Sequence, residues 1–206
     1  MSPLFAFLIA AVALAVTPGP GIAYVVARTV AGGRTEGLAS CLGTAVGGLL
    51  HVLAAALGIS LLIAQSAFAF SLVKYVGAAY LVYLGIRMLL RKNHGIHAVD
   101  VSSQGPRRAF LEGIVVETLN VKTALFFLAF LPQFVSANQP LVPQLVTLGG
   151  ICVTLNTAAD VVAVFTADRL LNSKVARATR ARILALASGS TMLGLGAYLA
   201  LAKREA

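Results

Sequence analysis

Long apolar stretches alternate along the chain with short polar connections, and this pattern predicts helices that cross a membrane. Each stretch is close to the roughly 20 residues that a membrane-spanning helix requires. The stretches are Leu4–Val26, Leu38–Ala64, Ala67–Leu90, Ala109–Phe134, Gln144–Ala167 and Ile183–Ala202. We therefore expect an all-α membrane protein with six transmembrane helices and no separate soluble domain.

The first apolar stretch is interrupted by Thr17, Pro18, Gly19, Pro20 and Gly21. Proline lacks the backbone N–H and clashes with the preceding helical turn, so a helix breaks there. Within lipid, unpaired backbone groups are tolerated only where protein or a water-filled cavity satisfies them. Many secondary transporters build their substrate sites from such broken helices. The segment is therefore expected to line a substrate site.

Features of the first half recur in the second half at an offset of 103 residues. A Phe-Leu pair at 7–8 precedes Thr-Pro at 17–18 with the same spacing by which Phe-Leu at 110–111 precedes Asn-Val at 120–121. Each half holds three apolar stretches, and an odd number makes the second half enter the membrane in the opposite sense. The sequence therefore predicts two inverted repeats with a second helix break near Asn120. Their bounds are about 1–91 for repeat 1, about 92–108 for a linker and about 109–206 for repeat 2.

Composition agrees with a membrane protein. The chain is 59% hydrophobic and only 11% charged, whereas a soluble domain carries about 25% charged residues. Its net charge of +9 could suggest nucleic acid as a partner. The basic residues, however, lie between the apolar stretches, which is typical of membrane orientation. We expect a lipid bilayer around the protein and no nucleic-acid partner.

The distribution of basic residues predicts the orientation. Twelve of the sixteen lysines and arginines lie in or beside the connections that follow the first, third and fifth stretches. The opposite loops, 65–71 and 136–143, contain none. Positively charged connections remain in the cytoplasm. The basic loops are therefore expected to be cytoplasmic and both termini external.

Polar side chains inside the apolar stretches are the candidate site. Charged groups cost several kcal/mol in lipid, about 2.5–3.5 on insertion scales, so they face the protein interior or a cavity. Such residues are Lys122, Asp160, Glu117, Asn120, Asn156 and His51. A structural ion pair of Lys122 with Asp160 or Glu117, and a histidine that only bridges helices, are the alternatives for this set.

These groups suggest a transport mechanism. The half-helix that begins after the first break presents partial positive charge to a substrate carboxylate, and Lys122 adds a full charge. Asp160 or Glu117 would hold the substrate amine or carry a coupling proton. The two halves would then rock about this centre to give alternating access.

Other functional classes fit the sequence less well. A thiol-disulfide electron carrier would use Cys41 and Cys152, which are more simply small apolar residues. No hydrolase or metalloprotease motif is present, so no catalytic residue, metal or cofactor is expected. A passive small-solute channel and a homo-oligomeric state are left open.

Several longer motifs together resemble one known family. They are Thr17-Pro18-Gly19-Pro20, Gly43-Thr44-Ala45-Val46-Gly47, Lys74-Tyr75-Val76-Gly77 and Leu119-Asn120-Val121-Lys122-Thr123. The chain resembles the LysE/RhtB family of amino-acid exporters over nearly its whole length. The resemblance implies a bacterial inner-membrane protein that exports amino acids or related metabolites, driven by the proton gradient. It also implies that the two broken segments belong to the functional centre. Val121 stands where the family usually has proline, and Gly21 where it commonly has asparagine.

Overall fold

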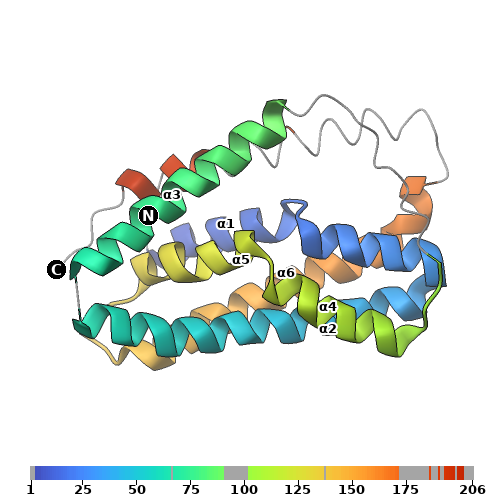
Figure 1. The fold of residues 1–206 in the computed structure, drawn as a ribbon, viewed down its shortest axis with the longest axis horizontal. Helices are drawn as coiled ribbons and strands as arrows, with labels where there is room; N and C mark the ends of the chain where they lie inside the picture. The colour runs from blue at the N-terminus through green and yellow to red at the C-terminus, as the bar shows by residue number, and fades with distance from the viewer. Residues whose placement is uncertain are drawn as a thin grey trace.

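The computed structural model describes residues 3–65, 67–90, 102–136, 138–171, 186, 190, 193–197 and 199–201, and most of these residues are helical (Figure 1). In chain order the elements are α1 (Pro3–Val16), α2 (Pro20–Gln65), α3 (Ala67–Leu90), α4 (Pro106–Thr118), α5 (Val121–Leu125), the π-helix η1 (Phe126–Phe130), the 3-10 helix η2 (Leu131–Phe134) and α6 (Leu141–Leu171). The all-α prediction is confirmed for these residues. The predicted sixth span lies mostly outside them, as does the first part of the predicted linker, so the six-span inverted repeat stays a prediction.

Several of these helices have the length and composition of membrane spans. Among the described residues, Pro20–Gly58 and Leu141–Ala167 have the length and hydropathy of a membrane span, although Pro20–Gly58 is interrupted at Gly32–Gly33. The pair Pro106–Thr118 and Val121–Phe134 meets the same criterion as one span bent by 45°. Large apolar side chains such as Leu57 cover their outer surfaces, which suits contact with lipid rather than water.

Helix α2 reverses direction at Gly32 and Gly33, so it consists of a first limb, residues 20–31, and a second limb, residues 34–65 (Figure 1). Gly33 has a φ of 71°, a region that glycine adopts without steric cost. A Cβ atom on Gly37 would lie 3.1 Å from the Cβ atom of Thr29, although eight residues of straight helix would span about 12 Å. The two limbs therefore lie side by side.

The backbone leaves helical geometry at two places inside the bundle. The first break, residues 17–19, separates α1 from α2, and the second break, residues 119–120, separates α4 from α5. Both predicted breaks are confirmed, the second despite Val121. One detail was wrong: Pro20 and Gly21 form the first turn of α2. Proline is well suited to the first helical position, where its missing N–H would have no intrahelical partner.

Glycines allow the second limb and α4 to approach closely. A Cβ atom on Gly43 would collide with the carbonyl oxygen of Phe110, and one on Gly47 would lie 2.8 Å from that of Ile114. A Cβ on Gly113 would likewise lie 2.8 Å from the carbonyl oxygen of Ser40. Small residues permit this kind of backbone contact between membrane helices. The contact holds the second break against the middle of the second limb.

Helix α6 runs antiparallel to the second limb. Asp160 is hydrogen-bonded to Thr44, and Val153 lies close to Gly48 further along the same pair of helices. The end of α2, the start of α3, η2 and the start of α6 lie at one end of the bundle, whereas the bend within α2 and residues 102–105 lie at the other (Figure 1). The connections predicted to be cytoplasmic thus share an end in the part of the chain that is described.

Candidate functional site

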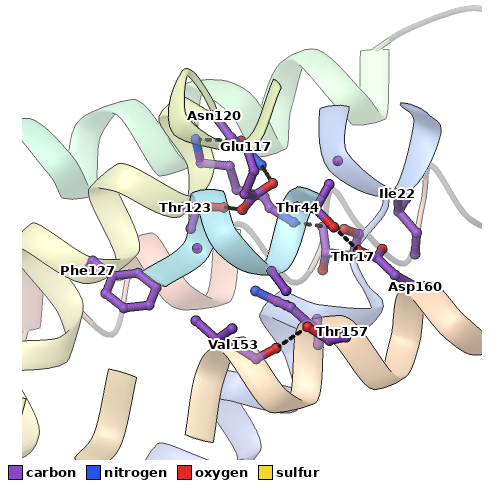
Figure 2. A pocket seen from close by; sticks show the side chains of 16 residues that line it. Thr17, Ile22, Thr44, Glu117, Asn120, Thr123, Phe127, Val153, Thr157 and Asp160 are labelled. Carbon is purple, nitrogen blue, oxygen red and sulfur yellow. Dashed lines mark hydrogen bonds between the residues drawn. The ribbon is translucent and has the colours of Figure 1, made fainter. Parts of the chain in front are cut away.

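A small cavity lies between the two breaks, the second limb and α6 (Figure 2). Its lining consists of Ala15, Thr17, Gly21, Ile22, Thr44, Ala45, Gly48, Glu117, Asn120, Lys122, Thr123, Phe127, Val153, Asn156, Thr157 and Asp160. The cavity volume of about 30 Å³ suits a water molecule, which needs roughly 10–15 Å³ on this measure. A solute as large as an amino acid therefore requires the surrounding helices to separate.

The first break is stabilised by a lysine from the second half of the chain. Lys122 Nζ donates to the carbonyl oxygens of Leu14 at 3.1 Å and Thr17 at 2.9 Å. These carbonyls lie at the C-terminal end of α1, where helix dipoles place partial negative charge. The Thr17 hydroxyl donates back to the carbonyl of Ala13. The ammonium group thus takes over the role of the backbone donors that the break removes.

The second break is stabilised by side chains of its own segment. The Asn120 side-chain oxygen accepts from the Lys122 amide at 3.2 Å and so caps the N-terminus of α5. Asn120 Nδ2 donates to one Glu117 carboxylate oxygen at 3.0 Å, and the Thr123 hydroxyl donates to the other at 2.7 Å. His51 Nε2 lies 2.8 Å from the Glu117 carbonyl oxygen, as its hydrogen-bond donor. Both oxygens of the Glu117 carboxylate are therefore engaged within the break.

Helix α6 contributes one polar face to the cavity. Val153, Asn156, Thr157 and Asp160 follow the three-to-four-residue spacing that puts side chains on the same side of a helix. Asp160 is buried, and its Oδ2 accepts from the Thr44 hydroxyl at 2.9 Å. This hydrogen bond joins α6 to the second limb.

Three ionisable groups border the cavity without touching one another. Lys122, Glu117 and Asp160 all line it, yet none of the ion pairs within 4 Å in the described part of the chain joins any two of them. The structural ion pair considered from the sequence is therefore not formed. The three charges instead face one another across the cavity, and opposite charges interact more strongly there than in water.

The structure brings together seven of the eleven residues that the sequence nominated for the site. These are Thr17, Gly21, Glu117, Asn120, Lys122, Asn156 and Asp160. Pro18, Gly19, Pro20 and His51 are not among the lining residues. Gly19 packs against Lys122, since a Cβ on it would lie 3.1 Å from Cε and Nζ. His51 lies one layer away, stacked on Phe127 with ring centroids 6.1 Å apart.

Three lining threonines were not nominated from the sequence: Thr44, Thr123 and Thr157. Thr157 is three residues before Asp160, and Thr123 directly follows Lys122. A hydroxyl group within one helical turn of an intramembrane charge could therefore have indicated these lining residues from the sequence. The signal is weak because a threonine hydroxyl can also bond its own helix, as that of Thr157 does to the Val153 carbonyl.

Gly21 allows the two breaks to pack closely against each other. A Cβ on Gly21 would lie 2.6 Å from Glu117 Oε2, closer than real contacts allow. An asparagine at this position, as in the family pattern, would require Glu117 to move away from Asn120. Gly21 in this chain is therefore matched to the way Glu117 closes the second break.

The two cysteines lie at opposite ends of the cavity. Cys41 packs with Val25 and Val164, and Cys152 belongs to a separate apolar cluster that includes Phe127. Both are buried and neither forms a disulfide. A thiol-disulfide carrier needs two cysteines close enough to bond to each other, or a thiol that a partner can reach. Two buried cysteines that lie far apart therefore disfavour the electron-carrier alternative.

Comparisons with known proteins identify the family. The family model described as LysE type translocator matches residues 12–203. An uncharacterised membrane protein of Vibrio cholerae is 33% identical over 152 residues, which cover 73% of this chain and 74% of that protein. The homoserine/homoserine lactone efflux protein of Salmonella typhimurium is 31% identical over 149 residues, 70% of each chain. No solved structure gives a significant match.

This chain belongs to the LysE family of translocators. The resemblance seen in the sequence motifs is confirmed. The family consists of membrane transporters rather than enzymes, in agreement with the prediction from the sequence.

Proposed function

We propose that this protein exports small amino compounds from the cytoplasm, and that Asp160 binds their ammonium group. The observation that carries the proposal is the position of Asp160 on the cavity between two broken helices. One of its carboxylate oxygens is bonded to Thr44, and Asn156 lies one turn away on the same lined face. A carboxylate beside polar amide and hydroxyl groups is a suitable partner for a primary ammonium.

The charges around the cavity favour a cationic group in the substrate. Two carboxylates, Glu117 and Asp160, face one ammonium, that of Lys122. The Lys122 ammonium already donates to two backbone carbonyls at the first break, and the Glu117 carboxylate already accepts two hydrogen bonds. Asp160 is then the charged group with most capacity left for a solute.

The named relatives suggest the same chemistry. The Salmonella proteins are named for efflux of homoserine and homoserine lactone. These two compounds share an α-ammonium group, while ring closure removes the free carboxylate from the lactone. Recognition through the ammonium would serve both. When a carboxylate is present, the N-terminus of α2 at Gly21 and Ile22 offers backbone N–H groups and partial positive charge.

Six helices in two inverted repeats, with bounds of about 1–91 and 109–206, are the architecture that we propose for this function. The supporting observations are the two breaks at equivalent positions and the grouping of connections by charge at one end. A reporter fused near Gly95 should then read as cytoplasmic and one near Asn138 as external. The reverse result would overturn the orientation.

Export would proceed by alternating access coupled to protons moving inward, with Asp160 as the proposed proton carrier. Substrate ammonium and proton would then compete for one carboxylate, which is a simple basis for antiport. A passive channel would show flux that does not depend on an imposed pH gradient. The electron-carrier alternative requires the cysteines, so export should persist when both Cys41 and Cys152 are replaced by alanine.

The test uses purified protein in proteoliposomes, with homoserine and homoserine lactone as probes. Asp160→Asn should reduce efflux of both compounds by at least tenfold and remove its dependence on the pH gradient. Thr154→Val is the matched control, because Thr154 lies exposed on another face of α6 and bonds only within the helix. Wild-type efflux and pH dependence in Asp160→Asn would contradict the assignment.

A further inference from the structure

A buried apolar layer separates the cavity from the end of the bundle that carries Gly32–Gly33. Val25, Cys41 and Val164 form this layer, and each is at most 1% exposed. Each lies three or four residues from a cavity-lining residue on its own helix: Gly21, Thr44 and Asp160, respectively. Because three or four residues make one helical turn, the layer is one turn thick on every helix that contributes to it. We call these three residues the plug.

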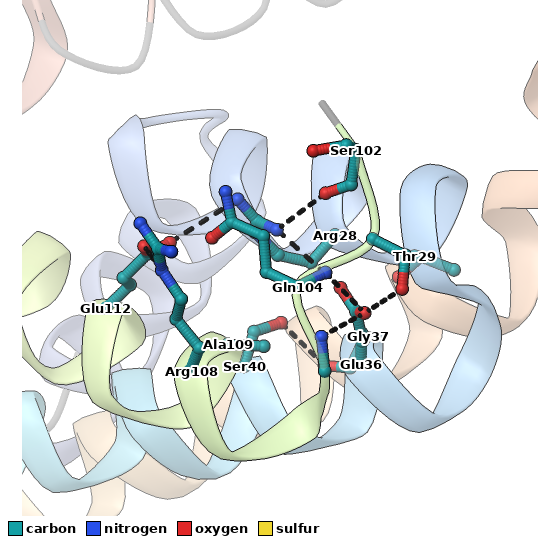
Figure 3. Close-up of polar contacts among 12 residues, drawn as sticks. Arg28, Thr29, Glu36, Gly37, Ser40, Ser102, Gln104, Arg108, Ala109 and Glu112 are labelled. Carbon is teal, nitrogen blue, oxygen red and sulfur yellow. Dashed lines mark hydrogen bonds and ion pairs between the residues drawn. The ribbon is translucent and has the colours of Figure 1, made fainter. Parts of the chain in front are cut away.

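A network of charged groups lies beyond the plug (Figure 3). Arg28 on the first limb is 3.6 Å from Glu36 on the second limb and 3.4 Å from Glu112 on α4. It also donates to the carbonyl oxygen of Ser102 at 3.3 Å. Arg28 and Glu36 are both buried. One guanidinium group thus connects both limbs of α2 with the segment that begins the second half.

The Glu36 carboxylate fixes the start of α4. Its Oε1 accepts from the Ser103 hydroxyl at 2.6 Å and from the backbone N–H groups of Gln104 and Gly105 at 3.0 and 2.7 Å. These hydrogen bonds favour the carboxylate form of the buried Glu36 side chain. It takes the place of an N-cap side chain, which Gly105 cannot supply.

The ion pairs of this network can separate at a modest cost in free energy. Arg28 Nε and Glu36 Oε2 are buried without a hydrogen-bond partner among the described residues. Buried ion pairs contribute little net stability, because the loss of hydration offsets their attraction. The closed arrangement can therefore be specific without being so stable that it prevents separation.

We propose that Arg28, Glu36 and Glu112 form the cytoplasmic gate of the transport pathway, with the plug as its inner layer. The gate holds the two halves together at this end while the cavity is shut from the cytoplasm, and its ion pairs separate when solute enters. This inference rests on the proposed export function for the direction of transport and on the loop charges for the side. It adds a role for residues that do not touch the cavity.

The native cysteines provide the test. Cys41 belongs to the plug, whereas Cys152 lies at the opposite end of the cavity, so only Cys41 should become reactive when this gate opens. The full-length protein in inside-out and right-side-out vesicles is exposed to a charged, membrane-impermeant thiol reagent, and each cysteine is quantified by mass spectrometry. Arg28→Gln should speed modification of Cys41 from the cytoplasmic face on the order of tenfold, leaving Cys152 unchanged. Arg28→Lys keeps the charge but loses the two-nitrogen fork, so modification of Cys41 should fall between the wild-type and Arg28→Gln rates.

Arg108→Gln is the matched control. Arg108 pairs with the same Glu112 carboxylate at 2.8 Å, but within α4 and with a side chain that is 63% exposed, so it does not join the halves. Equal labelling of Cys41 in Arg28→Gln and Arg108→Gln would overturn the gate, and acceleration only from the external face would overturn its cytoplasmic assignment. If Arg28→Gln exposes both cysteines equally, the protein has unfolded. Glu112→Gln then decides, since a selective rise at Cys41 supports the gate and its absence overturns it.

The labelling does not depend on any transported solute. Selective exposure of Cys41 in a protein that moves neither homoserine nor its lactone would support the gate and contradict the proposed substrates. Normal export of these compounds with unchanged labelling of Cys41 would support the proposed substrates and contradict the gate.

Discussion

The two helix breaks, at residues 17–19 and 119–120, are created by different chemistry. At the first break, Pro18 and Pro20 make a continuous helix unfavourable whatever surrounds them. At the second break no proline is present, and the geometry depends on hydrogen bonds of Asn120 and Glu117. The first is thus enforced by the backbone and the second by side chains. The same structural feature, an interrupted helix beside a cavity, is thus formed in two ways. The break that depends on side-chain hydrogen bonds should be the more sensitive to substitution of a single side chain.

The dependence between the breaks runs mainly in one direction. Lys122 follows the second break, yet its ammonium satisfies the carbonyls of the first, at Leu14 and Thr17. The prolines create acceptors without donors, and the other half supplies the donor. The prolines therefore determine where the first break lies, whereas Lys122 supplies the hydrogen-bond donor for its free carbonyl groups.

Replacing that lysine should have the largest effect. Lys122→Met removes two charge-assisted hydrogen bonds of about 1.5–3 kcal/mol each and leaves two carboxylates facing each other across the cavity. We expect efflux to fall on the order of 100-fold, while the protein still inserts. Efflux in proteoliposomes and the amount of protein in the membrane measure the two outcomes. Val121→Ala, which changes the exposed neighbouring side chain, should leave both unchanged. Normal efflux in Lys122→Met would show that export does not depend on the contact between the two breaks.

Removing the prolines of the first break should have the next largest effect. Pro18→Ala with Pro20→Ala favours a continuous helix by about 3 kcal/mol per residue. The carbonyls of Leu14 and Thr17 would then bond to their own backbone and release Lys122. Efflux should fall at least tenfold in proteoliposomes. Pro143→Ala, in the first turn of α6 and exposed, is the control. Wild-type efflux in the double variant would show that the first break is only a kink.

The second break should respond to loss of a single side chain. Asn120→Ala removes the cap of α5, an effect of about 0.5–2 kcal/mol, and takes one donor from Glu117. We expect roughly a tenfold loss of efflux, with Asn138→Ala in an exposed loop as the matched control. Adding Val121→Pro should restore much of the loss, because proline imposes the break without Asn120. Failure of the proline to rescue would show that Asn120 acts on the solute rather than on the backbone.

The sequence predicted both breaks because proline and a repeated spacing act locally. It did not predict which carbonyls Lys122 reaches, because that contact joins residues more than one hundred positions apart and depends on how the halves pack. It also extended the first break too far, since proline at position 20 suits the start of a helix as well as its interruption. The Arg28 network was missed for a related reason: only its pair of Glu112 with Arg108, four residues apart, follows from local spacing.

The smallest expected effect comes from Val121→Pro alone, and it tests whether the two breaks are interchangeable in kind. Val121 is the first residue of α5 and is 48% exposed, so a proline there loses no intrahelical hydrogen bond. Fewer unfolded conformations should raise stability by about 0.4–1 kcal/mol, seen as a rise of a few degrees in the apparent Tm in detergent, with efflux within about twofold of wild type. Val121→Ile controls for the change in the apolar surface. A lower Tm would mean that the second break needs backbone freedom at residue 121, and that its side-chain hydrogen bonds are part of a movement that a proline prevents.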